Sequence, residues 1–416
     1  MSKLLPVEEA LNRILAAMPT LPSEVVPLPL ALGRVTSTPI LSRRTQPPVA
    51  MSAMDGYAVR AEDVQSVPAT LTRVGSAPAG GAYEGEVGKG EAVRIFTGGP
   101  VPAGADAIVI QEDVDASSEE DGATITVRES VSSGTFVRPA GLDFKEGDEG
   151  LAPGKQLSPR DIGLLAAMNV PWVDVIRKPK VAILSTGDEI VRPGEPIGPN
   201  QIVSSNASSL AAIVEANGGI PIDLGISADD ASSLRSLAAG AKGADLLVTT
   251  GGASVGDHDL VQSALGDSEL GADALEVGFW RIAMRPGKPL IFGTLGGVPM
   301  LGLPGNPVST MVCAMIFLLP ALARMSGQSI ESASTIDLPL SVDLKPNDQR
   351  QDYVRATILR DAEGQRFVTP FSRQDSSMMS RLAAADGLIV RPPFDPARQK
   401  GELMKVIDLS SCGFVV

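Results

Sequence analysis

Acidic side chains follow a glycine-rich turn in the segment Asp245–Asp259, which reads DLLVTTGGASVGDHD. Its continuous apolar run is typical of a strand buried on both faces. Gly251 and Gly252 would then let a ligand approach the backbone amides. Carboxylates at the carboxyl end of such a strand lie where open α/β sheets bind ligands. The pattern indicates a pocket for phosphate and a metal ion. It is not a P-loop, because no Gly-Lys-Ser/Thr follows the glycines.

Two further segments repeat this arrangement of strand and polar turn. Lys180–Glu189 (KVAILSTGDE) ends in acidic residues, and Pro299–Asn306 ends in a Gly-Asn-Pro turn with Pro307 placed to open a helix. Between these strands Asn206 is expected to cap one helix, and Asp229 or Asp230 another. The alternation of strands and helices across residues 178–326 predicts a doubly wound α/β domain.

The rest of the chain divides by its pattern into three more domains. Its 416 residues are too many for one ordinary core. Residues 1–54 and 143–177 hold helical segments expected to pack together as a discontinuous domain I. Residues 55–142 alternate like short strands and predict an inserted β domain II, and residues 178–326 form the α/β domain III. Residues 327–416 alternate again and predict a small β-barrel or sandwich, domain IV.

Composition excludes several classes of protein. A net charge of −14 opposes binding to nucleic acid or to anionic membranes. Cys313 and Cys412 lack CxxC spacing, so a disulfide framework and a thiolate zinc site are not supported. His258 is the only histidine, which excludes a multi-histidine metal centre; it is interpreted as a positioned turn residue rather than a ligand.

Neither end nor middle of the sequence indicates targeting to a membrane. The first residues, MSKLLPVEEALNRIL, are amphipathic and unlike a signal peptide. The apolar run Val308–Ala323 is shorter than ~18 residues and contains Pro320, so a buried helix is expected rather than a membrane span. We therefore expect a cytoplasmic protein.

Six motifs in order resemble the molybdopterin molybdenumtransferase family, to which the E domain of gephyrin belongs. Three are those already quoted: KVAILSTGDE, GGASVGDHD and GLPGNPVS. The others are SAMDGYAVR (Ser52–Arg60), RIFTGGPVPAGAD (Arg94–Asp106) and RPGKP (Arg285–Pro289). The resemblance covers nearly the whole chain.

The resemblance implies an architecture and a reaction. Family members are elongated homodimers of four-domain chains, the third domain α/β and the fourth a β-barrel. They insert molybdenum from molybdate into adenylylated molybdopterin and release AMP in a step that depends on Mg²⁺. The implied partners are molybdopterin adenylyltransferase, which supplies the substrate, and molybdoenzyme apoproteins or their chaperones, which receive the cofactor.

For the acidic positions, the resemblance implies metal and catalytic roles. It marks Asp229 and Asp259 as metal ligands and, with Glu189, as catalytic carboxylates. Oxygen ligands of this kind suit Mg²⁺. A simple helix cap remains the alternative for Asp229. The glycine turn would contact substrate through Gly251, Gly252 and Ser254.

Basic residues would hold the anions. If residues 281–285 form a strand, Arg281 and Arg285 share a face and start ~13 Å apart, spaced to grip two ends of a phosphate-rich substrate. Lys288 follows a Pro-Gly turn that would aim its ammonium at the same place. A solvated basic strand is the alternative. The resemblance implies that molybdate meets Lys288, Pro289, Arg355 and Ser376.

Three residues outside domain III are implied to line a dimer cleft: Asp55, Thr97 and Asp143. For Asp55 and Thr97 the alternative is simple turn formation, because glycines follow both. The chain departs from the family at four positions. Met51 and Ser204 replace a common Asn and Asp, and Arg281 and Arg285 replace common lysines, which keeps charge but favours bidentate anion contacts.

Three other functions compete with molybdenum insertion. A paralogue could use tungstate on the same scaffold, which the sequence does not distinguish. A scaffold protein with a degenerate site would have lost the carboxylates, which are present here. A pterin-binding protein without catalysis would not need Glu189 or Asp259.

Overall fold

The computed structural model describes residues 4–252, 260–266, 271, 274–328 and 335–411. The chain forms two compact units. One comprises Met1–Glu24, Gly33–Ser37 and Val175–Val416, and the other comprises Val25–Leu32 and Thr38–Asp174.

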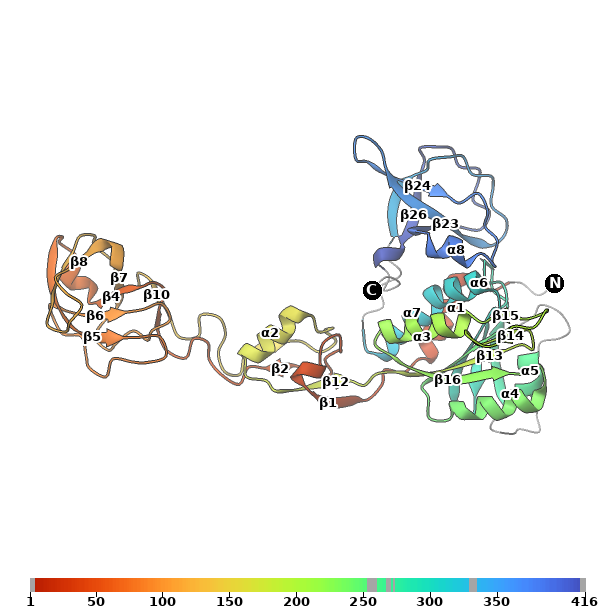
Figure 1. Ribbon diagram of the computed structural model, residues 1–416, viewed down its shortest axis with the longest axis horizontal. Coiled ribbons are helices and arrows are strands. Elements are labelled where there is room, and N and C mark those ends of the chain that lie inside the picture. Colours follow the sequence, from red (N-terminus) through yellow and green to blue (C-terminus); the bar gives the residue numbers. More distant parts are fainter. Residues whose placement is uncertain (1–3, 253–259, 267–270, 272–273, 329–334, 412–416) are drawn as a thin grey trace. The chain divides into compact units, whose positions relative to one another are not determined.

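A six-stranded sheet forms the centre of the α/β part of the first unit (Figure 1). Four strands are parallel, in the order β16 (Ile220–Ser227), β13 (Lys180–Thr186), β17 (Leu246–Thr250) and β21 (Val298–Leu303). Strands β20 (Ile291–Leu295) and β18 (Leu275–Trp280) extend the sheet antiparallel. The connecting helices are α3 (Asn206–Ala216), α4 (Ala231–Ala238) and α5 (Leu260–Leu265). The predicted α/β architecture is confirmed, with an antiparallel edge that the sequence pattern had not indicated.

Strand β13 is buried on both faces, which explains its continuous apolar sequence. Val181 and Ile183 belong to the same core as Leu210 of α3. Ala182 and Leu184 pack in the opposite core with Leu234 of α4. The sheet is therefore covered on both faces, as a doubly wound fold requires.

The predicted cap of α3 is wrong, and of the two caps predicted for α4 the structure has Asp230. Helix α3 begins at Asn206 itself, and its N-cap residue Ser205 makes no side-chain cap bond. The side-chain amide of Asn206 instead donates hydrogen bonds outside the helix, to the Thr250 hydroxyl and the Gly305 carbonyl. In α4 the cap is Asp230, which accepts from the amide of Ser233 at 2.9 Å.

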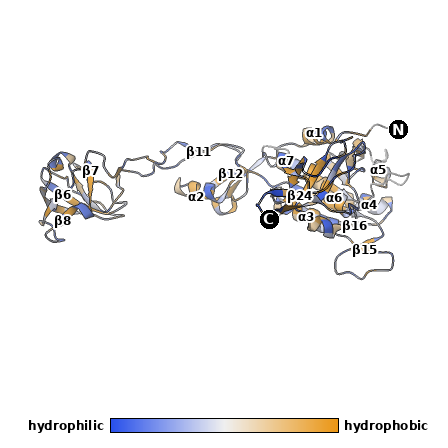
Figure 2. Cartoon of the chain, turned by 90° about the horizontal axis from the view of Figure 1, so that it is seen from above, coloured by the Kyte–Doolittle hydropathy of each residue, from blue (hydrophilic) through white to orange (hydrophobic). Residues whose placement is uncertain are grey.

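The apolar run after Pro307 is a buried helix in three parts: α6 (Pro307–Cys313), a π segment (Ala314–Leu318) and α7 (Leu319–Met325). Hydrophobic segments lie at the labels α6 and α7 in Figure 2. Among the described residues, this helix alone is long and apolar enough to cross a membrane, and 78% of its most apolar window is buried inside the protein.

Helix α1 (Val7–Ala17) packs against this same helix. Its buried residues Val7, Ala10 and Ile14 join the core that contains Ala321 and Leu322 of α7. The sequence predicts that α1 packs with the helical segment of residues 143–177. That packing partner is wrong, because the apolar face of α1 is already occupied by α7.

The C-terminal part of the first unit is built around a second six-stranded sheet, of which the strands after residue 334 are shown in blue in Figure 1. Its path is β19 (Met284–Arg285), β23 (Gln351–Arg360), β25 (Gly387–Arg391), β26 (Leu403–Asp408) and β22 (Thr335–Pro339), and β24 (Arg366–Pro370) pairs with β23. A bridge from Leu340 to Val368 brings the end of β22 to β24, so the sheet curls toward a closed barrel. The short helix α8 (Met379–Ala383) precedes β25.

The second unit contains a six-stranded sheet in the order β7-β4-β6-β5-β9-β8. Its strands are β4 (Gly56–Val59), β5 (Ala69–Ala77), β6 (Glu91–Ile95), β7 (Ala107–Ile110), β8 (Val114–Ala116) and β9 (Thr124–Val127). The unit also holds α2 (Pro159–Ala167), which begins with a capping box formed by Ser158 and Asp161.

Short elements complete the fold. The two-stranded pairs are β1 (Ser23–Pro27) with β12 (Trp172–Ile176), β2 (Ile40–Leu41) with β11 (Glu149–Leu151), β3 (Met51–Ser52) with β10 (Val137–Arg138), and β14 (Ile190–Val191) with β15 (Ile202–Val203). The short 3₁₀ turns are Leu28–Leu30, Ala61–Val64, Gln111–Asp113, Ala239–Ala241 and Leu409–Ser411.

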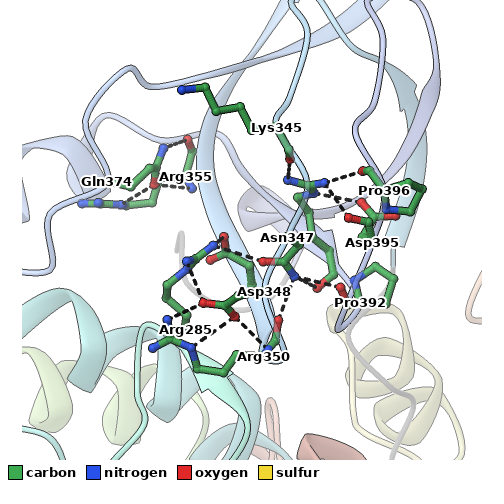
Figure 3. Close-up of polar contacts among 12 residues, drawn as sticks. Arg285, Lys345, Asn347, Asp348, Arg350, Arg355, Gln374, Pro392, Asp395 and Pro396 are labelled. Atoms are coloured by element: carbon green, nitrogen blue, oxygen red, sulfur yellow. Dashed lines mark hydrogen bonds and ion pairs between the residues drawn. The ribbon is translucent and has the colours of Figure 1, made fainter.

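Ion pairs hold β19 to its neighbours in the C-terminal β-sheet (Figure 3). The Arg285 guanidinium donates to Asp352, to Asp348 at 3.3 Å and to Asn347 at 3.1 Å. The side chain of Arg350 binds Asp348 from the other side at 2.6 Å. The hydrogen bond from Arg350, with help from the charge of Arg285, lowers the pKa of Asp348 to about 2.

This lowered pKa predicts a loss of stability in acid. Because the folded-state pKa of Asp348 lies below its usual value of 3.8, its contribution is fully present above that value and is lost as the pH falls toward about 2. We expect the free energy of unfolding of Asp348→Asn to fall less steeply than that of the wild type between about pH 4 and pH 2. Denaturant unfolding at several pH values measures this. Equal slopes in the variant and in the exposed control Asp361→Asn would contradict it.

Candidate functional site

The carboxyl ends of β13 and β17 open into one pocket of about 400 Å³. Polar and glycine residues from both strand ends line it, together with Leu260 and Ser263: Thr186, Gly187, Glu189, Asp229 and Gly252. After β13 the chain forms β16 on one side of β13 and then crosses to form β17 on its other side. The pocket therefore lies at the point where the strand order reverses. Open α/β sheets bind ligands at this position.

Reciprocal hydrogen bonds fix the acidic loops of this pocket. The carboxylate of Asp229 accepts from the amide of Asp188 at 3.3 Å, and the carboxylate of Asp188 accepts from the amide of Asp229 at 3.1 Å. A backbone bond from Gly187 to Ser227 holds the same two loops together. Since Asp230 is the helix cap, the alternative explanation of Asp229 as a cap is wrong.

Glu189 reaches the pocket because Gly187 leaves room for it. Gly187 has φ +136°, and a Cβ at this position would lie 2.4 Å from the Glu189 Oε2 atom. The amide of Ile202 donates to the Glu189 carbonyl at 2.7 Å, which fixes its backbone. Glu189 and Asp229 are both exposed to solvent and line the same cavity. Two carboxylates in one cavity repel each other and favour a bound cation.

A polar clamp holds the glycine turn against the Gly-Asn-Pro turn. The Asn206 side chain donates to the Thr250 hydroxyl and to the carbonyl of Gly305, both at 2.8 Å. Gly251 has φ +87°, and a Cβ there would lie 2.4 Å from the Thr186 carbonyl oxygen. The ends of three neighbouring strands, β13, β17 and β21, are thus joined at one edge.

The two turn glycines differ in their tolerance of a side chain. We expect Gly251→Ala to cost about 1–3 kcal/mol in backbone strain, beyond its steric clash with Thr186, and to distort the pocket. A Cβ on Gly305 would make only an ordinary 3.5 Å contact, so Gly305→Ala should fold like the wild type. Thermal unfolding of both variants measures the difference. Equal losses would mean that the clash at Gly251 is relieved elsewhere.

The C-terminal β-sheet brings a buried cation to the same edge. Arg355 on β23 is 2% exposed, and its guanidinium donates to the Gln374 side chain at 3.2 Å (Figure 3). It also donates to the Met378 carbonyl at 3.3 Å. Burial lowers the pKa of Arg355, and the charge of Asp375 opposes that shift. The amide of Val308, in the first turn of α6, donates to the Ser376 carbonyl at 3.0 Å. Ser376 therefore lies beside the Gly-Asn-Pro turn, and Arg355 is bonded to Gln374 and Met378, which flank Ser376 in the chain.

The basic segment of residues 281–289 is not one strand. Arg281 has φ +77°, which ends β18 before it, so the predicted shared face of Arg281 and Arg285 is wrong. The Arg281 guanidinium stacks on the Trp280 ring at 4.0 Å, and Arg285 is held by the ion pairs described above. Lys288 is exposed and, with Pro289, precedes β20, whose start pairs with the carboxyl end of β21.

In the second unit Asp55 and Thr97 form one hydrogen-bonded pair. One carboxylate oxygen of Asp55 accepts from the amide and from the hydroxyl of Thr97, each at 2.7 Å. These bonds, with the charge of Arg94, lower the pKa of Asp55. Asp143 is exposed, and its amide donates to Gln46. The expectation that these residues line a dimer cleft stays a prediction.

Ser254, His258 and Asp259 lie outside the described residues. Within the described ranges, no group of three His, Cys, Asp or Glu side chains is arranged to hold a metal ion. Sequence reasoning missed two residues. The sequence pattern predicts only a cap for Asn206 and no role for Asp188, which directly precedes Glu189. Both act by bonding to distant loops, which no local pattern shows.

Comparison with known proteins finds family matches along nearly the whole chain. It matches the "MoeA N-terminal region (domain I and II)" over residues 5–169, a "Probable molybdopterin binding domain" over 182–324 and the "MoeA C-terminal region (domain IV)" over 337–409. The molybdopterin molybdenumtransferase of Haemophilus influenzae is 35% identical, covering 93% of this chain and 94% of the relative. That of Bacillus subtilis is 32% identical, covering 97% and 94%.

Solved structures agree with these relatives. Two crystal structures of the molybdopterin biosynthesis moeA protein from Pyrococcus horikoshii have TM-scores of 0.83 and 0.79 at 32% and 29% identity. They cover 98% and 97% of this chain and 99% of their own. The fold and its relatives define a multidomain transferase. The chain belongs to the molybdopterin molybdenumtransferase family, which confirms the resemblance of its motifs.

Proposed function

We propose that this chain transfers molybdenum from molybdate to adenylylated molybdopterin, with Mg²⁺-dependent release of AMP. Family membership supports the transfer. The observation that carries the proposal is the cavity in which Glu189 and Asp229 lie together with the glycine turn at the switch point of the sheet. This cavity offers carboxylates and close backbone approach, the two features that cleavage of a phosphate anhydride needs.

Each carboxylate has a proposed task. Asp229 keeps one oxygen on the amide of Asp188, which orients its other oxygen as a ligand. Among the described residues, the Glu189 carboxylate has no hydrogen bond or ion pair that would compete with a substrate or a water, and Gly187 gives it room to move. We assign Glu189 to positioning the attacking water and accepting its proton.

The donor set suits Mg²⁺, since oxygen ligands with some waters are what this ion prefers. Asp229, with Asp259 of the undescribed segment, would hold it. When bound, the ion supplies charge neutralisation at the phosphate oxygens. The glycine turn at Gly251 and Gly252, with Ser254, would contact the substrate.

The buried Arg355 supports a molybdate site beside the Gly-Asn-Pro turn. Its guanidinium is already desolvated and is held by Gln374, so it is preorganised for an oxyanion. Ser376, Lys288 and Pro289 would complete that site from neighbouring loops. Arg281 and Arg285 are proposed to contribute positive charge along the same edge, although the ion pairs of Arg285 mean that a substrate must compete for it.

The remaining parts of the proposal concern assembly and location. We propose the four-domain division given above, except that α1 belongs with domain III. We also propose a homodimer whose cleft includes Asp55, Thr97 and Asp143, and a cytoplasmic location. Molybdopterin adenylyltransferase would deliver the substrate, and molybdoenzyme apoproteins or their chaperones would accept the product.

The test is AMP release from adenylylated molybdopterin by the purified chain, with and without molybdate and Mg²⁺. We expect release only with both, and a product that activates a molybdoenzyme apoprotein. Release without molybdate, or binding of the substrate with no release under any condition, would contradict the proposal. Repeating the assay with tungstate measures which oxyanion the site accepts.

A further inference from the structure

A second cavity, of about 390 Å³, lies beside the carboxylate pocket. It is formed by α3, the edge strand β16 and the segment that follows β14. Ser185 lines this cavity, whereas its neighbour Thr186 lines the carboxylate pocket. Successive side chains of a strand point to opposite faces, so the two cavities lie on opposite faces of β13. The second cavity is therefore a separate feature of the domain.

Ser185 brings an unsatisfied polar group into this cavity. The residue is 1% exposed, and among the described residues its hydroxyl has no hydrogen-bond partner. Leaving a buried hydroxyl unpaired costs free energy, because its hydrogen bonds to water are lost without replacement. Native proteins rarely keep such a group unless something else completes its bonds. The Ser185 hydroxyl therefore points to a ligand that enters the cavity.

The start of α3 indicates that this ligand is an anion. The helix has 11 residues, and no side chain caps its N-terminus. Ala207 and Ser208, in its first turn, line the cavity. The free amides and the positive end of the helix dipole at such a terminus favour negatively charged groups.

An arginine at the rim adds positive charge. The Arg192 guanidinium lies over Gly225 of β16, where a Cβ would be only 3.3 Å from its Nη2 atom. It pairs with Asp223 at 3.4 Å, and both side chains are half-exposed. Exposed pairs of this kind contribute little energy, so an anion can recruit Arg192 from Asp223. Asp223 also lines the cavity, and its carboxylate accepts from the amide of Gly225, which holds it on β16 beside Arg192.

We propose that this cavity binds the phosphate group of a phosphate monoester. The buried Ser185 hydroxyl, the hydroxyls of Ser204 and Ser208, the start of α3 and Arg192 would receive the phosphate oxygens. The apolar side chains of Ile183 and Ile226 would contact the organic part. Which phosphate monoester binds rests on the proposed function, because hydrolysis of the adenylate yields two of them, AMP and molybdopterin.

Titration calorimetry of the full chain with inorganic phosphate, AMP and adenosine tests this site. We expect saturable binding of phosphate and AMP and none of adenosine. Ser185→Ala should weaken phosphate binding about tenfold, because one hydrogen bond to a charged oxygen is lost. Ser204→Asp should abolish it, because a second carboxylate would join that of Asp223 at the cavity wall and Arg192 could not neutralise both. Ser341→Ala removes another buried hydroxyl without a described partner, in the C-terminal β part, and should leave the affinity unchanged.

The variants Ser185→Ala and Ser204→Asp are needed to assign the binding to this cavity, since AMP could also enter the carboxylate pocket. Tighter binding of AMP than of inorganic phosphate, lost in Ser185→Ala, would identify the nucleotide as the carrier; equal affinities would identify the phosphate alone as the recognised group. The proposal fails if phosphate does not bind, if adenosine binds as well as AMP, or if Ser185→Ala and Ser204→Asp bind like the wild type. These titrations contain neither molybdate nor Mg²⁺, so their failure would leave the proposed transfer reaction standing.

Discussion

Asp229→Asn is expected to lower the rate of AMP release about a hundredfold or more while leaving the fold intact. The amide side chain can still accept the hydrogen bond from Asp188, so the loop should keep its shape. What is lost is the negative charge that binds Mg²⁺, and metal-assisted charge stabilisation contributes several kcal/mol to phosphoryl cleavage. Single-turnover release of AMP at increasing Mg²⁺ measures the effect, and part of the loss should be recovered at high Mg²⁺.

The adjacent residue supplies a matched control. Asp230→Asn makes the same chemical change one position along the chain. Asp230 caps α4 through the amide of Ser233, and Asn caps helices about as well as Asp. We therefore expect this variant to keep its stability within a few tenths of a kcal/mol and its full activity. Similar losses in both variants would assign the effect to general negative charge rather than to Asp229.

Arg355→Met is expected to abolish the response to molybdate without destabilising the free protein. Arg355 is buried, and removing a buried cation recovers its desolvation cost. Gln374 would keep its backbone bonds to residue 355, because it accepts from that amide and donates to that carbonyl. The free energy of unfolding should thus change by less than about 1 kcal/mol, or rise.

Molybdate provides the functional readout for this variant. At a hundred times its Kd a ligand stabilises the folded state by about 2.7 kcal/mol, and this gain should be seen in the wild type but not in Arg355→Met. Arg360→Met, on the exposed end of the same strand, should respond to molybdate like the wild type. Loss of several kcal/mol in the free Arg355→Met protein would show that the arginine is a structural residue.

The sequence by itself determined the strands and turns that build the site. Strands such as β13 and β17 are buried on both faces, so their apolar runs are uninterrupted and end at glycine-marked turns. The sequence alone therefore predicts that Glu189 and Gly252 lie at the carboxyl edge of the sheet.

Only the tertiary structure decided which of several similar residues acts. Sequence position alone left Asp229 and Asp230 equivalent, and the fold gave the cap to one and the pocket to the other. The fold likewise pairs Arg285 with two aspartates more than sixty positions away. It also bonds the side chain of Asn206 to the distant Gly305 carbonyl, where the sequence predicts only a helix cap. Hydrogen bonds and ion pairs between distant segments depend on where the chain folds back, and a local pattern carries no information about that. The periodicity of a strand or helix is a local property, which is why it could be read from the sequence.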